Sequence, residues 1–467
     1  MTDRSRLLRG GARAVTGLLV VAAATAGVVL VGNVQLPTVA RAPLALTVDT
    51  TQDTTRTLVC AGSFSELGAD PARPGVAIPV GEATTATSGA ATSDATLARG
   101  EGAGLPAVVF APMSDPLAAA QFQSIDTENL RGSAASSCAE PRNEQWLIGG
   151  ASSLGYSTTL SLGNPGTVPA TASITVYDEN GEVDAVQTAG VRVAPGTQQT
   201  VSLNGYAPDR ERLAVLVEST GAPVTAHLGV AQSSGITPFG LSGVTPQTEP
   251  STSLVIPAIE NADGDDRGPN DSGEGDAFPM IIRALAPGEA GEFAGTAVVR
   301  AVDKNGKSTE VGEIELVPNA IGELSVTTLP EGANALIVDA DVPMIAGAAG
   351  VADDTNEHDF EWFSPAPVIA ADTEVAAPVM RGGRLVIVNP SDADAEITIS
   401  RASGTGRDTS ATVGPGAATV VSAPADAIIT SSEPVYAGVR FVSETALAGY
   451  PILAPDPRDG TLTVYPR

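Results

Sequence analysis

An acidic run near the middle of the chain has oxygen ligands at the spacing of a calcium-binding loop. Four carboxylates fall at the first, third, ninth and twelfth positions of the EF-hand pattern: Asp263, Asp265, Asp271 and Glu274. The fifth position, which needs an oxygen ligand, is Arg267. Because Asp, Gly, Asn and Pro also compose solvated loops, the run predicts either a calcium site or a plain hairpin loop without a cofactor.

Three aromatic residues lie close together in the sequence, at Phe360, Trp362 and Phe363. In an extended segment, side chains two residues apart point to the same face, so Phe360 and Trp362 would lie side by side. Aromatic side chains of this kind favour packing between domains. The alternative is an exposed platform that binds cell-wall glycan.

Few residues are available for catalysis. The chain has two histidines, His227 and His358, without a ligand partner two to four residues away, and it has no G-x-S-x-G motif. We therefore expect a protein that is not an enzyme. The enzyme alternative requires acidic residues joined across a domain seam, in a cleft that raises their pKa values.

Cys60 and Cys138 are the only cysteines of the chain. In an oxidising compartment such a pair predicts one disulfide. A redox or metal-binding thiol pair is the alternative, and it lacks both a CxxC spacing and a neighbouring histidine.

An apolar segment follows the N-terminus. Val15 to Gly32 carry no charge, and four arginines precede them. This length can just cross a bilayer, and the arginines would keep the N-terminus in the cytoplasm. The segment predicts a single-pass membrane protein with the bulk of its chain outside the cell. The alternative is a long signal peptide that is cleaved at Ala40-Arg41-Ala42, which would release a secreted protein.

Length, composition and charge set the broad class. A chain of 467 residues is too long for one ordinary core and predicts about three or four domains. Abundant Val, Thr, Gly and Pro are typical of many short strands joined by turns. The formal net charge of -29 repels phosphate backbones, so we expect no nucleic-acid partner.

A pattern of apolar runs and turns occurs three times in the outer part of the chain. Two copies contain an Asp-x-Asn-Gly turn between apolar runs, at residues 178–181 and 303–306. Asn-Gly favours a type I′ turn, which predicts hairpin-linked strands. Short strands with turns every ~8–12 residues are typical of a β-sandwich.

The predicted fold class is all-β, with an N-terminal transmembrane helix followed by tandem immunoglobulin-like β-sandwich units. The predicted segments are 1–14, a cytoplasmic arginine-rich tip; 15–34, the transmembrane anchor or long signal peptide; 44–150, a membrane-proximal β domain with the disulfide; and three sandwich repeats at 151–250, 251–368 and 369–467. Short Pro-rich strings join the repeats and predict semi-rigid linkers.

Several motifs resemble a family of uncharacterised actinobacterial exported proteins that is classified only as a domain of unknown function. They are Cys138 and Trp146 followed by Gly149-Gly150, the run from Leu160 to Gly166, and the Asp-x-Asn-Gly turn. The resemblance implies the repeated all-β architecture and the exported location. It implies no activity and no site.

These features predict a non-enzymatic envelope protein, a tethered rod of β-sandwiches that acts as a scaffold or interaction module outside the membrane. Its expected partners are envelope proteins, with the membrane contacted through the N-terminal helix. The alternative is a cell-wall glycan-binding protein that uses the aromatic cluster at residues 360–363.

Overall fold

The computed structural model describes most of the chain beyond residue 45. The described residues are 46–49, 55–73, 75–90, 93–101, 103–184, 190–263, 279–288, 295–354, 357–443, 445–455 and 461–464. The predicted transmembrane segment, residues 15–34, lies outside them. Within these ranges, no helix has both the length and the apolar character needed to span a membrane.

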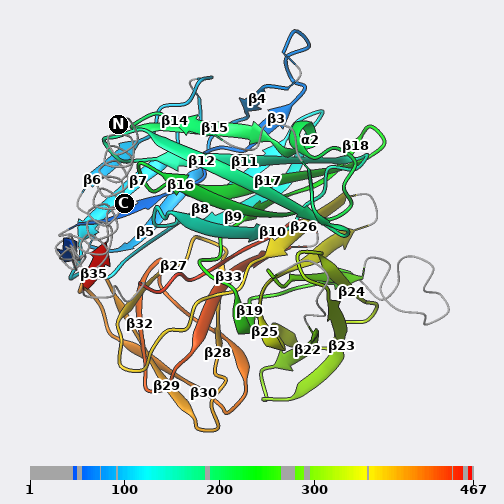
Figure 1. Cartoon of the computed structure of the whole chain (residues 1–467). Helices are drawn as coiled ribbons and strands as arrows, with labels where there is room; N and C mark the ends of the chain where they lie inside the picture. Colours follow the sequence, from blue (N-terminus) through cyan, green and yellow to red (C-terminus); the bar gives the residue numbers. More distant parts are fainter. Residues whose placement is uncertain are drawn as a thin grey trace, which may run out of the picture. The chain divides into compact units, whose positions relative to one another are not determined.

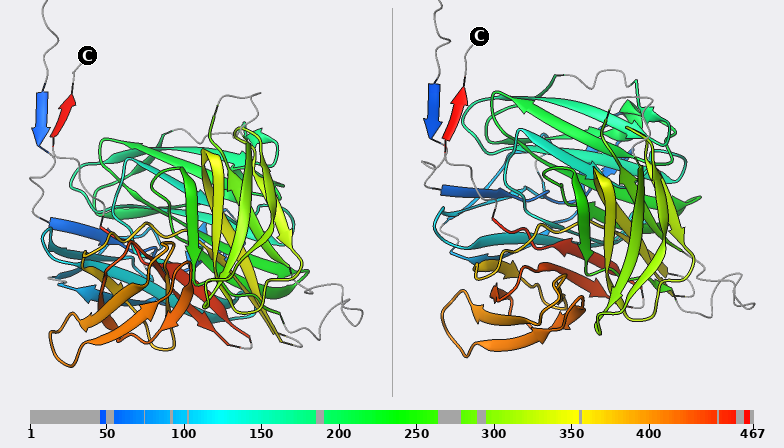
Figure 2. Two further views of the ribbon diagram at one scale, coloured as in Figure 1. Left: turned by 90° about the horizontal axis from the view of Figure 1, so that it is seen from below. Right: turned by 60° about the horizontal axis from the view of Figure 1, so that its bottom comes forward.

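Contacts divide the chain into two compact units. One unit consists of the two ends of the chain, residues 1–52 and 458–467; its described part is an antiparallel ribbon of β1 (Leu46–Asp49) and β35 (Thr461–Val464). The other unit, here called the main body, runs from Asp53 to Pro457. Figures 1 and 2 show the main body as successive β bodies, coloured from blue through green and yellow to red.

The N-terminal domain opens the main body. It has two three-stranded sheets, β2-β7-β6 and β5-β8-β9, and the small hairpin β3-β4. Its strands are β2 (Thr55–Val59), β3 (Ser65–Leu67), β4 (Ala77–Pro79), β5 (Thr84–Gly89), β6 (Ser93–Thr96), β7 (Ala107–Pro112), β8 (Leu117–Asp126) and β9 (Arg131–Ser137).

The first sandwich unit follows directly. One sheet has the order β10-β16-β12, with β13 and β14 both paired to β12, and the other has the order β15-β11-β17-β18. Its elements are β10 (Glu144–Ile148), β11 (Tyr156–Asn164), β12 (Ala170–Asp178), β13 (Gly181–Glu182), β14 (Val191–Val193), β15 (Thr197–Ser202), α2 (Leu203–Tyr206), β16 (Ala214–Thr220), β17 (Thr225–Ser234) and β18 (Thr237–Val244).

The second sandwich unit contains one strand of 22 residues, β25, which takes part in both of its layers. One layer has the order β19-β25-β22-β23 and the other β24-β21-β25-β26, and β20 pairs parallel to β25. Its strands are β19 (Ser251–Pro257), β20 (Ala262–Asp263), β21 (Met280–Leu285), β22 (Gly295–Asp303), β23 (Ser308–Leu316), β24 (Gly322–Val326), β25 (Ala333–Asp354) and β26 (Glu357–Phe363).

The third sandwich unit has two four-stranded sheets, β27-β32-β29-β30 and β31-β28-β33-β34. Its strands are β27 (Val375–Pro378), β28 (Arg384–Val388), β29 (Ala395–Arg401), β30 (Thr409–Val413), β31 (Ala418–Val421), β32 (Asp426–Ser431), β33 (Tyr436–Val442) and β34 (Leu447–Pro451).

The three units share one strand order. Without the two-residue strands β13 and β20, each unit pairs its strands as 1-6-3-4 in one sheet and 5-2-7-8 in the other, where β25 supplies strands six and seven of the second unit. An immunoglobulin domain instead has the sheets A-B-E-D and C-F-G. The units therefore have two layers, as predicted, but their first strand pairs with the sixth and not with the second.

Two segment boundaries differ from the predicted ones. β10 pairs with β16, so the first unit begins at Glu144, before the predicted boundary at residue 151. The third unit ends with β34 at Pro451, whereas β35 pairs with β1 and belongs to the other compact unit.

Alternating side chains build each core. Along β12, Ala170, Ala172, Ile174 and Val176 are buried, while the residues between them are exposed or half-buried. They pack against residues of the facing sheet, including Leu160. Since each sheet buries one face, period-two sequences of Val, Ile, Leu and Ala are what this architecture requires.

The last strands of the four bodies meet in a central seam, formed by β9, β18, β26 and β34. Both β18 and β34 lie against β9 and against β26. Glycine permits this close approach, because a Cβ atom at Gly243 of β18 would come within 2.6 Å of the Ala135 carbonyl oxygen of β9. The bodies are therefore packed around a shared seam, and the prediction of a rod is wrong for the main body.

Candidate functional site

The predicted disulfide between Cys60 and Cys138 is confirmed. Cys60 follows β2 and Cys138 follows β9, so the bond joins the two sheets of the N-terminal domain. Both residues are 1% exposed. The bond is a buried structural crosslink.

The aromatic cluster lies on β26, in the central seam. Phe360, Trp362 and Phe363 are 3%, 5% and 3% exposed. Phe360 and Trp362 belong to the core of the first unit, and Phe363 belongs to the core of the second. The cluster therefore packs between bodies and leaves no aromatic face for a sugar ring.

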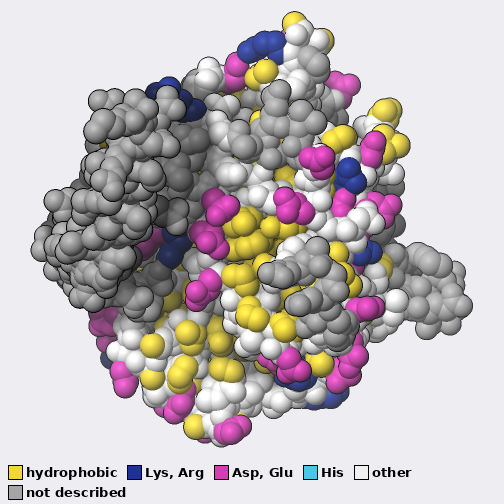
Figure 3. All heavy atoms as spheres, viewed as in Figure 1, with side chains coloured by type: hydrophobic (Ala, Val, Ile, Leu, Met, Phe, Trp, Pro, Cys, Tyr) yellow, Lys and Arg dark blue, Asp and Glu magenta, His cyan; other side chains and the backbone are white. Residues whose placement is uncertain are grey.

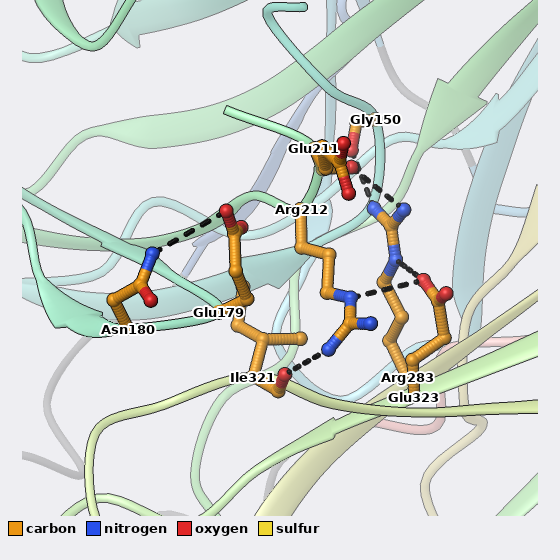
Figure 4. A network of polar contacts seen from close by, with 8 residues as sticks. All are labelled: Gly150, Glu179, Asn180, Glu211, Arg212, Arg283, Ile321 and Glu323. Atoms are coloured by element: carbon orange, nitrogen blue, oxygen red, sulfur yellow. Dashed lines mark hydrogen bonds and ion pairs between the residues drawn. The ribbon is translucent and has the colours of Figure 1, made fainter. Parts of the chain in front are cut away.

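Arg283 connects the first and second units, as Figure 4 shows. Its guanidinium donates hydrogen bonds to the carbonyl oxygens of Gly150 and Glu211 and to Oε2 of Glu323, which lies 2.7 Å from Nε. It also lies 4.8 Å from the centre of the Trp362 ring, within the range of a cation–π interaction. Burial lowers the pKa of Arg283, and Glu323 opposes this shift. The network is a structural contact between the two units.

The predicted calcium ligands are not brought together within the described residues. Asp263 is the last residue of β20, while Asp265, Asp271 and Glu274 lie outside the described residues. In the described part of the chain, no three His, Cys, Asp or Glu side chains are grouped so that they could hold a metal ion. Calcium binding stays a prediction from the sequence.

Asp359 is the polar centre of the seam. Its side chain is fully buried, and its two oxygens accept hydrogen bonds from four backbone N–H groups. The donors are Leu241 of β18 (3.1 Å), Ser133 of β9 (2.8 Å), Leu447 of β34 (3.2 Å) and Phe360 of β26 itself (3.0 Å). One carboxylate therefore ties together the last strands of all four bodies.

Glu361 lies two residues further along β26 and is also fully buried. Its Oε1 accepts a hydrogen bond from the Ser242 hydroxyl, whose oxygen accepts one from the Trp362 N–H group. Burial raises the pKa of Glu361 well above its usual value, and the charge of Asp359 adds to the shift. Burial also raises the pKa of Asp359, although its four N–H donors favour the anion. The proton of the pair therefore belongs on Glu361.

This carboxyl pair is close and has raised pKa values, as the enzyme alternative requires, but it does not lie in a cleft. Asp359 and Glu361 are both 0% exposed, and neither lines one of the cavities described below. Backbone N–H groups and a serine hydroxyl bind three of the four oxygens, and Oε2 of Glu361 is buried without a hydrogen-bond partner among the described residues. The geometry gives a substrate no access to them.

The two histidines lie in different environments. His227 is 2% exposed, and its Nε2 is 3.0 Å from the carbonyl oxygen of Ser137. Burial lowers its pKa to about 4, so the ring is neutral at physiological pH. It borders a cavity of about 30 Å³, which is room for about one water molecule. His358 stacks on Phe239, with the ring centres 4.6 Å apart.

A larger cavity of about 400 Å³ lies where the connections between the bodies converge, and we call it the junction cavity. Residues 138–142, 246–249, 365–368 and 452–455 contribute to its wall, and these are the segments that follow the four strands of the seam. Further lining comes from Arg56, Leu58, Leu117, Gln145, Leu254 and Tyr450. The volume falls within the usual range of ligand pockets, about 300–1,000 Å³.

Hydrophobic side chains gather in the middle of the face that Figure 3 shows, and acidic side chains surround them. The wall of the junction cavity is apolar in the same way, because it consists largely of leucine, proline and alanine. Proline in the connecting segments was recognisable in the sequence as a linker signal. The convergence of these segments could not be recognised in the sequence, because it depends on the packing of four strands that are distant in the chain.

Comparison with known proteins adds little beyond a family. No curated protein sequence matches the chain. A structure described as a tetra-tandem repeat in the extending region of a large adhesion protein is 9% identical, covers 83% of this chain and 92% of its own, and has a TM-score of 0.13. The BSP domain of a biofilm associated protein is 12% identical, covers 79% of this chain and 67% of its own, and has a TM-score of 0.11. TM-scores this low give no support for a shared fold.

A family match covers far more than half of the sequence. Residues 80–424 match DUF5719, a family of unknown function. The matched range runs from the N-terminal domain into the third sandwich unit and includes the seam strands β9, β18 and β26. The chain therefore belongs to the DUF5719 family of unknown function.

Proposed function

We propose that this protein is a non-enzymatic component of the cell envelope, held in the membrane by residues 15–34, that binds a partner protein outside the cell. The observation that carries the proposal is a pair of aliphatic side chains in water. Leu154 and Ile236 are 100% and 98% exposed, far more than any other described large hydrophobic residue.

The two side chains lie on neighbouring loops at one end of the first unit. Leu154 lies in the loop between β10 and β11, and Ile236 lies in the hairpin turn between β17 and β18. The loops touch, because the Ser233 N–H group donates to the Gly155 carbonyl oxygen at 2.7 Å. Aliphatic side chains this exposed contribute almost nothing to their own fold, and contact with an apolar groove on a partner would bury them.

Crosslinking in living cells tests the proposal. A photoreactive amino acid at position 154 or 236 of the full chain should capture one discrete envelope protein. The matched control is Val420 in the third unit, which is 37% exposed and should capture none. Equal products at all three positions, or no product at 154 and 236, would contradict the proposal.

The membrane tether requires a separate measurement. Sequencing the N-terminus of the protein from cell fractions should find an uncleaved segment in the membrane fraction. A mature N-terminus near Ala42 in the medium would show that the segment is a signal peptide, and the tether would then be wrong while the binding proposal could stand.

A further inference from the structure

The junction cavity has one buried cation with unused hydrogen-bonding capacity. Arg56 is 6% exposed and lines the cavity. Its Nε lies 2.9 Å from Oε1 of Glu140, and its Nη2 lies 3.8 Å from the sulfur of Met113, a weak acceptor. Despite the short distance to Glu140, Nε makes no hydrogen bond with a described residue. A buried guanidinium with a free donor group favours an oxygen acceptor from a ligand.

Three large polar side chains of the wall are already bonded to the protein. Gln145 bonds the backbone at Val224 and Ala226, Gln247 bonds both backbone groups of Ala346, and the Tyr450 hydroxyl donates to the Pro378 carbonyl oxygen. A sugar needs several free donors and acceptors to replace its hydration. These residues do not offer them, and the apolar remainder of the wall favours a hydrocarbon.

Charge on the wall limits the ligand to one negative group. Arg56 and Arg142 line the cavity together with Glu140 and Glu249, so the four side chains are balanced in sign. A doubly charged phosphate would meet two carboxylates. A single carboxylate can pair with Arg56, because the Met113 sulfur is a weak acceptor for its Nη2.

We propose that the junction cavity binds an aliphatic monocarboxylate, with the carboxylate paired to Arg56 and the chain lying along the leucine, proline and alanine wall. Leu58, Leu117 and Leu254 provide much of that wall. The proposal is independent of the protein partner, because Leu154 and Ile236 do not line the cavity.

Photolabelling of the full chain tests this proposal with a dodecanoate that carries a diazirine in its tail. Label should appear in peptides that contain residues 246–254, 365–368 or 452–455, and excess unlabelled dodecanoate should abolish it. Dodecanol, which lacks the charge, should compete at least tenfold less well than dodecanoate. An apolar hexapeptide with a free C-terminal carboxylate should not compete, and preferential competition by that peptide would overturn the acyl chain as the ligand.

Two variants complete the test. Arg56→Gln should reduce labelling at least tenfold, while Arg407→Gln, an exposed control, should leave it unchanged. If Arg56→Gln does not fold, the Val368→Trp variant provides the test. Val368 lines the cavity but is 49% exposed, so a larger side chain there should narrow the cavity without unfolding the protein. This variant should also reduce labelling. Labelling outside these segments, or equal labelling in the folded variants, would refute the proposal.

Discussion

At the scale of single residues, Asp359 is the residue that we expect to tolerate substitution least. In Asp359→Asn, one oxygen is replaced by an NH₂ group that would face backbone N–H donors of Ser133 and Leu447. Such a substitution breaks a buried network and should lower the free energy of unfolding by about 3–5 kcal/mol. Urea unfolding of the two proteins measures the difference.

A matched control separates this effect from the loss of one negative charge. Asp392 is exposed, and Asp392→Asn should change the free energy of unfolding by less than about 0.5 kcal/mol. Equal stability of the Asp359→Asn and Asp392→Asn variants would show that the seam does not depend on the carboxylate.

His227 should give the stability a pH dependence of defined sign. Its pKa in the folded protein, about 4, lies below the unfolded value of about 6.5, so between these values only the unfolded chain binds the proton. This contribution to the free energy of unfolding therefore rises with pH across the window, by up to about 3 kcal/mol. Glu361 acts in the opposite sense, because its raised pKa makes stability fall as the pH rises.

A comparison with His227→Gln isolates the histidine. As the pH is lowered from about 7 to about 4, the wild-type free energy of unfolding should fall relative to that of the variant. A difference that stays constant with pH would mean that His227 is not held neutral by burial.

Sequence reasoning succeeded for the cysteines and failed for the acidic residues of the seam. Only one pairing was available to Cys60 and Cys138, so the disulfide could be predicted. By contrast, Asp359 and Glu361 alternate with Phe360 and Trp362 and look like the solvent face of an edge strand. Their burial depends on β9, β18 and β34, which are distant in the sequence. The residues of β26 therefore do not indicate that these strands cover them.

At the scale of elements, a repeated asparagine closes the second strand of two units. Asn164 is the last residue of β11, and its Nδ2 donates hydrogen bonds to the carbonyl oxygens of Val168 and Val193. Asn389 directly follows β28 and donates to those of Ala393 and Val413. Both asparagines are 0% exposed, and in the sequence each precedes a proline.

Replacement of either asparagine should be costly in the same way. Asn164→Ala and Asn389→Ala each leave buried carbonyl oxygens without donors and should lower the free energy of unfolding by about 2–3 kcal/mol. Asn305→Ala, at an exposed hairpin turn, serves as the control and should change it by less than about 0.5 kcal/mol. Similar values for all three variants in urea unfolding would refute the role of the buried asparagines.

The Asp-x-Asn-Gly turns show how far local sequence can be read. Both hairpins occur, β12 with β13 and β22 with β23. The predicted type I′ geometry does not, because Asn180 and Asn305 are absent from the described non-glycine residues with positive φ. Instead, Oδ1 of Asp303 accepts hydrogen bonds from the N–H groups of Asn305 and Lys307, so the side chain determines the turn.

At the scale of the whole molecule, the seam should make the main body unfold as one unit. Separate sandwich domains joined by linkers would melt independently. Here each body supplies a strand to the seam and loses hydrogen bonds if a neighbour opens. Scanning calorimetry of the full chain should therefore give one main transition, with a calorimetric enthalpy close to the van't Hoff enthalpy.

Three or four resolved transitions, or a van't Hoff enthalpy several times smaller than the calorimetric one, would show that the bodies are independent. Asp359→Asn provides an internal comparison, because loosening the seam should split the single transition into several.

The seam also affects when folding can finish. Ser133 and Asp359 are 226 residues apart, and Ser137 and Pro451, which also share a hydrogen bond, are 314 apart. Because synthesis starts at the N-terminus, β9 is made long before the residues that accept its hydrogen bonds. We expect truncated chains that end before β26 to be degraded in the cell, even where they contain a complete sandwich unit. The strand order is repeated three times, but folding is completed only once, when the last strand joins the seam.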